Sequence, residues 1–168
     1  MTRRRAALHA ILLGGCTAAT LDILAAFALA ARHGGTPARI LKSIASGVLG
    51  RDAFDGGAAT AALGLALHFA ILLVAAALYF AASRRLPVLA LQPLRFGALY
   101  GIAVWAFMHG IVLPLSAVPF QIELRPGAVA LQLAIHVVCV GWPIAWAVRR
   151  DAVFAALPPP VRATHPVS

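Results

Sequence analysis

Four ionisable residues lie inside the long apolar stretches of this 168-residue sequence: Asp22, His68, His109 and His136. Such groups are costly in a bilayer, so they generally face the interior of a helix bundle and pair with one another. Because imidazole titrates near neutral pH, an aspartate beside a histidine could hold or relay a proton. Histidines on facing helices could instead ligate haem iron or a metal, with the carboxylate as a further ligand.

A structural role is the third alternative, because polar side chains also join membrane helices, at about 0.6 kcal/mol per hydrogen bond on average. Among the functional alternatives, Asp22 is the expected proton acceptor or fixed counter-charge. His68 and His136 are its expected imidazole partners, and His109 is the expected gate or outer partner. If a metal is bound, these three histidines are the expected ligands. The sequence identifies no cofactor.

No catalytic residue is assigned, because the chain lacks the signatures of soluble enzymes. It has no glycine-rich phosphate loop after a strand, no His-Glu-x-x-His motif and no nucleophile elbow. The two cysteines, Cys16 and Cys139, fall inside apolar stretches and lack metal-type spacing, so we expect two small core residues.

The composition predicts a membrane protein. Hydrophobic residues make up 62% of the chain and charged residues 11%, with a mean hydropathy of +0.91. In soluble domains, about half of the residues are hydrophobic and about a quarter are charged. We predict an all-α membrane protein, a four-transmembrane-helix bundle that forms a single membrane domain over residues 1–150. The predicted spans are residues 6–31, 57–82, 94–118 and 127–148.

Counted from the outer end of each predicted span, the four ionisable residues lie at similar depths, about 13–17 Å. In the third span, Pro114 removes a backbone donor and predicts a kink. Residues 151–168 contain three consecutive prolines and are predicted to form a flexible cytoplasmic tail.

A short amphipathic helix is predicted at residues 37–49, after Thr36 as N-cap and Pro37 as first helical residue. Its apolar residues share one side, and its polar residues, among them Arg39 and Lys42, occupy the other. This pattern is typical of an interfacial helix. The alternative is a helix that packs across the mouth of the bundle.

Small residues predict how the first two spans pack. Gly14, Gly15 and several alanines surround Asp22 on one helix face, and Gly57 and Gly64 lie on a ridge that ends at His68. Faces of small residues let helix backbones approach closely. We therefore expect the first two spans to pack through these faces.

The net charge of +9 comes from basic residues that cluster at the ends of apolar runs rather than among aromatic residues. The expected partner is thus the lipid bilayer and not a nucleic acid. Nine Lys and Arg residues fall on one predicted side and five on the other, which predicts that both termini are cytoplasmic. Four helices are few for a complete transport pathway, so a homo-oligomer is plausible.

The N-terminus has two features of a processed segment, three arginines before an apolar run and the sequence Leu13-Gly14-Gly15-Cys16, which resembles a lipoprotein cleavage box. However, the apolar run continues about 15 residues past Cys16, whereas a lipid-anchored protein usually continues as a polar tether. We therefore expect an uncleaved first span.

The second half of the chain resembles a known family. The matching elements are Leu67-His68, Leu78-Tyr79, Leu86-Pro87, Gly97 and Gly101, Phe107-Met108-His109, Leu113-Pro114-Leu115, Ile135-His136 and Arg149-Arg150-Asp151. Their order resembles the YagU-like family of bacterial inner-membrane proteins, over roughly residues 68–151. The resemblance implies a location in the bacterial inner membrane and makes the three histidines and Pro114 family features. It implies no substrate.

Overall fold

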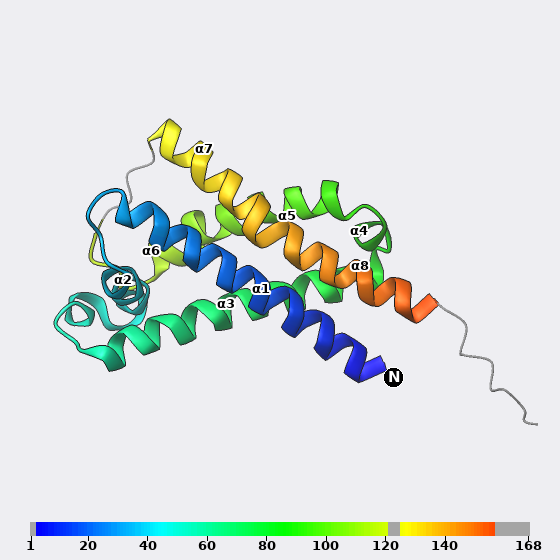
Figure 1. Cartoon of the computed structure of the whole chain (residues 1–168), viewed down its shortest axis with the longest axis horizontal. Helices are drawn as coiled ribbons and strands as arrows, with labels where there is room; N and C mark the ends of the chain where they lie inside the picture. Colours follow the sequence, from blue (N-terminus) through cyan, green and yellow to red (C-terminus); the bar gives the residue numbers. More distant parts are fainter. Residues whose placement is uncertain (1–2, 121–124, 157–168) are drawn as a thin grey trace, which may run out of the picture.

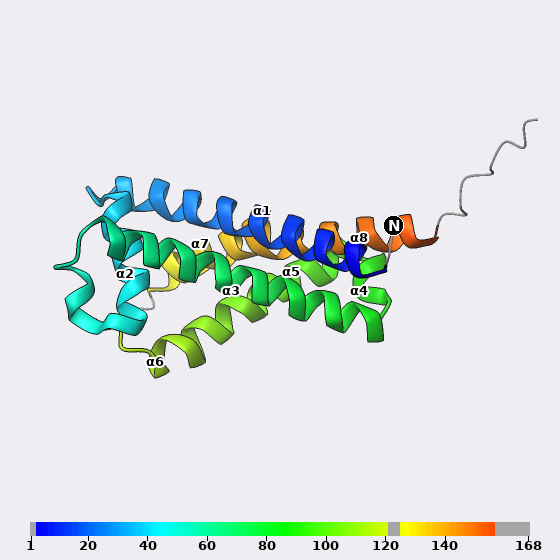
Figure 2. The same cartoon turned by 90° about the horizontal axis from the view of Figure 1, so that it is seen from below.

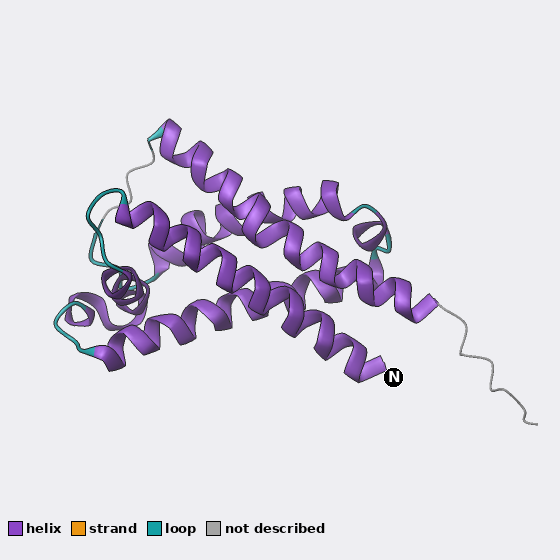
Figure 3. Ribbon diagram, viewed as in Figure 1, coloured by secondary structure: helices purple, strands orange, loops and turns teal. Residues whose placement is uncertain are grey.

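The computed structural model describes residues 3–120 and 125–156, which form helices joined by short loops and contain no strand (Figure 3). Within these residues, four helices are long and apolar enough to cross a membrane: Arg4–Ala31, Ala58–Arg85, Pro93–Leu115 and Pro126–Val153. They pack together as a bundle (Figures 1 and 2). The predicted all-helical, four-span fold is confirmed.

The first half of the chain contains two uninterrupted long helices with a short helical segment between them. The elements are α1 (Arg3–Ala31), α2 (Pro37–Leu49), the 3₁₀ turn η1 (Gly50–Ala53) and α3 (Ala58–Arg85). The α2 bounds agree with the prediction, and the Thr36 hydroxyl accepts a hydrogen bond from the backbone N–H of Arg39. This bond satisfies one of the free N–H groups at the start of the helix.

In the second half, each long helix contains a π-helical segment, in which N–H groups bond to the carbonyl five residues back. A short helix, α4 (Val88–Leu91), precedes them. The third span consists of α5 (Pro93–Phe107), η2 (Met108–Val112) and α6 (Leu113–Leu115). The fourth consists of α7 (Pro126–Ile135), η3 (His136–Gly141) and α8 (Trp142–Ala156).

The third and fourth spans end at other residues than predicted. The third span ends at Leu115 instead of residue 118, because the backbone of Ser116 is extended and the Ala117 N–H donates to the Gly47 carbonyl, 3.0 Å away. The fourth helix continues to Ala156, into the segment predicted as a tail, and Ala152 packs against the core. The rest of that tail, residues 157–168, lies outside the described residues.

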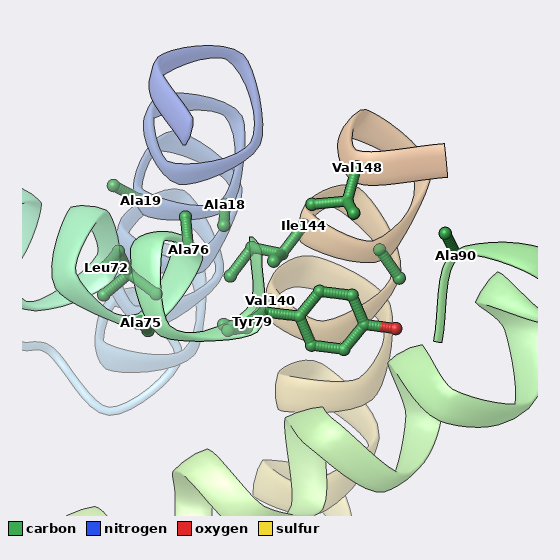
Figure 4. Packing of buried hydrophobic residues seen from close by; sticks show 11 residues of the cluster. Ala18, Ala19, Leu72, Ala75, Ala76, Tyr79, Ala90, Val140, Ile144 and Val148 are labelled. Carbon is green, nitrogen blue, oxygen red and sulfur yellow. The ribbon is translucent and has the colours of Figure 1, made fainter. Parts of the chain in front are cut away.

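The core joins α1, α3, η3 and α8 through small side chains (Figure 4). Ala18 and Ala19 of α1 are fully buried, and so is Ile144 of α8. Tyr79 lies between α3 and the fourth span, and its hydroxyl donates to the Leu89 carbonyl at 2.9 Å. Alanine faces permit this close approach of the helix backbones. In a membrane, close packing rather than the exclusion of water holds helices together.

The outer surface of the bundle is apolar. The side chains of Leu24, Val74 and Leu78 are 54%, 59% and 62% exposed. Large exposed apolar surfaces are rare on soluble proteins, whereas lipid tails cover them in a bilayer. The structure therefore supports association with the lipid bilayer.

Three of the four glycines predicted to pack do so, but with different partners. Gly15 lies against Leu72 and Leu73 of α3, as predicted for the first two spans. Gly14 instead faces α8, and Gly64 faces α2. The prediction for Gly57 is wrong: it precedes α3 as its N-cap residue, and a Cβ atom there would contact nothing within 4 Å.

The fourth span also approaches α5 closely. A Cβ atom at Gly141 would collide with the Gly97 carbonyl, and one at Gly101 would collide with the His136 carbonyl. Gly97 and Gly101 stand one turn apart, so they form a groove in α5 that receives η3. This contact fixes the position of His136 relative to the third span.

α2 packs against α3 across one end of the bundle (Figures 1 and 2). Ala45 and Ser46 are fully buried, and a Cβ atom at Gly64 would collide with the Leu41 carbonyl. These contacts favour the alternative in which the short helix caps the bundle. Its position relative to a membrane surface stays a prediction.

We expect Gly64→Val to displace α2 from α3. The added side chain meets a backbone carbonyl, which can move away only if α2 shifts. The free energy of unfolding should therefore fall by about 1–2 kcal/mol. Thermal unfolding in detergent, with limited proteolysis at residues 37–53, measures both effects. Gly127→Val is the matched control, because a Cβ atom there contacts nothing within 4 Å. Equal behaviour of the two variants would contradict the prediction.

Candidate functional site

Asp22 and His68 face each other between α1 and α3. The His68 Nε2 atom lies 3.9 Å from Asp22 Oδ2, and the two side chains are only 10% and 16% exposed. The same Nε2 atom lies 3.0 Å from the Ala19 carbonyl oxygen. Because a carbonyl only accepts, Nε2 carries the hydrogen and Nδ1 is the nitrogen that accepts a proton. Of the two histidines predicted to pair with Asp22, His68 is the one that lies opposite it.

The local sequence of α1 explains this placement. Ala18 and Ala19 have no exposed surface, and Gly15 lets α3 approach. Leu21 and Leu24 occupy the exposed side of the helix. The carboxylate at position 22 therefore turns toward α3, where the His68 imidazole faces it.

His109 and His136 share one local arrangement, on different helices. Each Nδ1 atom lies 3.0 Å from the carbonyl oxygen four residues earlier, that of Trp105 for His109 and that of Gln132 for His136. Each Nδ1 therefore donates, which leaves Nε2 as the nitrogen that can accept a proton. Both rings are thus held in one tautomer by their own helix.

These two histidines also stand at the two π-helical segments. His109 lies in η2, and His136 is the first residue of η3. The Leu113 N–H donates to the Met108 carbonyl and the Trp142 N–H to the Val137 carbonyl, five residues back in each case. Such wide turns are rare and occur frequently at functional sites.

The wide turn of η2 lies just before Pro114, the residue at which the sequence predicts a kink. Pro114 has no N–H to give to the Gly110 carbonyl, and η2 ends at Val112, two residues before it. After the proline, the helix lasts only to Leu115.

The fold brings the four predicted residues into one region. His136 interacts electrostatically with the Asp22 carboxylate, and it interacts in the same way with the other two histidines. η3 packs against both α1, which carries Asp22, and α5, which precedes the segment of His109. We call Asp22, His68, His109 and His136 the Asp–His cluster.

Trp105 and Gln132 connect the outer part of this cluster, and the sequence analysis did not identify their contact. The Trp105 indole N–H donates to the Gln132 side-chain oxygen at 3.0 Å. Its ring also stacks on that of His109, with centroids 4.4 Å apart and planes at 24°. Each residue precedes a cluster histidine by four positions, one helical turn, and this shared spacing is the signal that was present in the sequence.

The arrangement of donors does not form a metal centre by itself. Within residues 3–120 and 125–156, no three His, Cys, Asp or Glu side chains are grouped so that they could hold a metal ion. The two cysteines are unpaired, and each is partly buried in its helix. In the same ranges, every buried side-chain nitrogen and oxygen has a hydrogen-bond partner.

Comparisons with known proteins add no family. The resemblance to the YagU-like family stays a prediction, because no family model matches the chain, and no curated protein or solved structure matches it either.

Proposed function

We propose that this protein holds and moves protons within the membrane through its Asp–His cluster. The observation that carries the proposal is the approach of His68 to Asp22, 3.9 Å apart and largely buried. The charge of the same carboxylate also acts on His136. Removing either charge from water alone would be costly, whereas a paired carboxylate and imidazolium cancel each other's net charge.

The geometry suggests an order for proton movement. Asp22 acts as acceptor or fixed counter-charge, and the His68 ring lies beside it with Nε2 bonded to the Ala19 carbonyl. A proton that reaches Nδ1 of His68 makes an imidazolium, which the carboxylate stabilises. His136 and then His109 extend the path toward the outer end, because each keeps Nε2 free to accept a proton.

The location and orientation are part of the proposal. The helices run alternately up and down, so the starts of α1 and α5 and the ends of α3 and α8 lie at one end of the bundle (Figure 1). That end carries the larger group of arginines: Arg4, Arg5, Arg84, Arg85, Arg95, Arg149 and Arg150. By the positive-inside rule it is the cytoplasmic end, in the bacterial inner membrane that the YagU-like resemblance implies. A homo-oligomer would supply the additional helices that a full transport pathway needs.

Proteoliposomes test the proposal. Vesicles with an internal pH-sensitive dye and an imposed pH difference should lose that difference faster with the protein than without it. Asp22→Asn keeps the side-chain shape but cannot ionise, so it should reduce the rate to that of empty vesicles. Asp52→Asn, an exposed aspartate in η1, is the matched control and should leave the rate unchanged. An unchanged rate in Asp22→Asn would refute the proposal.

A structural role is the second candidate, and one observation favours it. The described residues leave no buried side-chain nitrogen or oxygen without a partner, which is what interhelical hydrogen bonding alone requires. In that case, wild-type vesicles would dissipate the pH difference no faster than empty ones. Asp22→Asn would then affect only the stability of the bundle.

A further inference from the structure

A groove of about 530 Å³ runs between α1 and α8, at the end of the bundle that carries the N-terminus. α1 and α8 lie side by side at this end (Figures 1 and 2). The floor consists of Leu13 and Thr17 from α1 with Pro143 and Ala147 from α8. It is almost entirely apolar, and it is separate from the Asp–His cluster.

Cationic and aromatic side chains of α8 border this apolar floor. Arg149 and Arg150 line the groove together with Trp146. The Arg149 guanidinium lies over the Trp146 ring, 5.2 Å from its centroid, and the ring is 48% exposed. Tryptophan and arginine at the end of a span are typical of the membrane–water interface.

The groove is maintained by the packing beside it. Gly14 brings α1 against α8 so closely that a Cβ atom there would lie 3.0 Å from Ala147 Cβ and 3.2 Å from Ile144 Cα. The two helices are therefore in backbone contact at this crossing and cannot slide together to close the space. In a membrane, an apolar space open to the bilayer fills with hydrocarbon.

We propose that the groove binds one anionic phospholipid. Its phosphate contacts Arg149 and Arg150 at the interface, and an acyl chain lies along Leu13, Thr17 and Pro143. The charge of the border selects the headgroup, since basic pockets between membrane helices bind anionic headgroups. The apolar floor selects a lipid over a free phosphate.

Native mass spectrometry of the purified protein tests this proposal. Protein in mild detergent is mixed with phosphatidylglycerol or with phosphatidylcholine, and lipid adducts are counted. We expect at least fivefold more adduct with phosphatidylglycerol, and about fivefold less of that adduct in Arg149→Gln. Arg84→Gln, an exposed arginine at the end of α3 on the same side of the bundle, is the matched control and should retain the adduct.

A second variant tests the acyl-chain part. Leu13 is 39% exposed, so Leu13→Trp should fold and fill the groove, and the phosphatidylglycerol adduct should decrease. Equal amounts of adduct with the two lipids would refute the proposal. An equal loss of the phosphatidylglycerol adduct in Arg149→Gln and Arg84→Gln would also refute it, because only the general surface charge would then matter. Adducts that persist in Leu13→Trp would also refute it. These readouts do not involve proton movement, so they are independent of the proposed function.

Discussion

Gly141→Leu is expected to abolish most of the correctly folded protein, because position 141 has no room for a side chain. A Cβ atom there would collide with the Gly97 carbonyl and lie 2.9 Å from the Gly101 backbone nitrogen. Obstruction by flexible side chains can be relieved, but here the obstructing atoms belong to the backbone of α5. The loss in the free energy of unfolding should therefore be at least about 3 kcal/mol, at or above the upper end of the usual cost of overpacking.

The measurement is the yield of monodisperse protein after detergent extraction, followed by thermal unfolding monitored by circular dichroism. Gly127→Leu is the matched control, since it introduces the same side chain into the same span where nothing lies within 4 Å. It should fold with wild-type yield. If Gly141→Leu were as stable as Gly127→Leu, the close approach of α5 to η3 would be incorrect.

His68→Leu is expected to be the most destabilising single change in the Asp–His cluster. It removes the donor to the Ala19 carbonyl and the partner of the Asp22 carboxylate at once. The Ala19 carbonyl keeps its bond within α1, so it loses only a second hydrogen bond. The larger cost is the Asp22 carboxylate, which is left largely buried without its partner. We expect a loss of about 2–3 kcal/mol in the free energy of unfolding in detergent.

A double variant separates the pair from simple packing. Adding Asp22→Leu to His68→Leu removes the stranded carboxylate, so the double variant should be more stable than His68→Leu alone. His9→Leu is the control, because His9 is exposed near the start of α1 and does not belong to the cluster. If the two leucine substitutions had additive costs, Asp22 and His68 would not interact energetically.

The sequence alone predicted the four spans and the helix at residues 37–49. Long apolar runs and an amphipathic pattern are local properties, and in a bilayer the backbone of each span must satisfy its own hydrogen bonds. Helix ends were less accurate. The Ala117 N–H bonds to Gly47 in another element, and Ala152 packs against the distant core; neither contact is visible in the local pattern.

The sequence also predicted which way Asp22 faces, because the small residues of its helix face leave only that side for another helix. It named His68 and His136 as the expected partners of Asp22 but did not decide which of them lies opposite. Nor did it predict that Trp105 bonds to Gln132. Those contacts depend on which helices are neighbours. In the structure, α1 packs against both α3 and α8, and η3 packs against α5.

Composition and periodicity therefore determined that the chain forms membrane helices and which faces carry the costly groups. Only the tertiary structure decided how these faces combine. Gly14 and Gly15 are adjacent and chemically identical, yet one contacts α8 and the other α3. A small face permits close packing with any complementary helix, so the partner is set by the fit of all four spans together rather than by the residue itself.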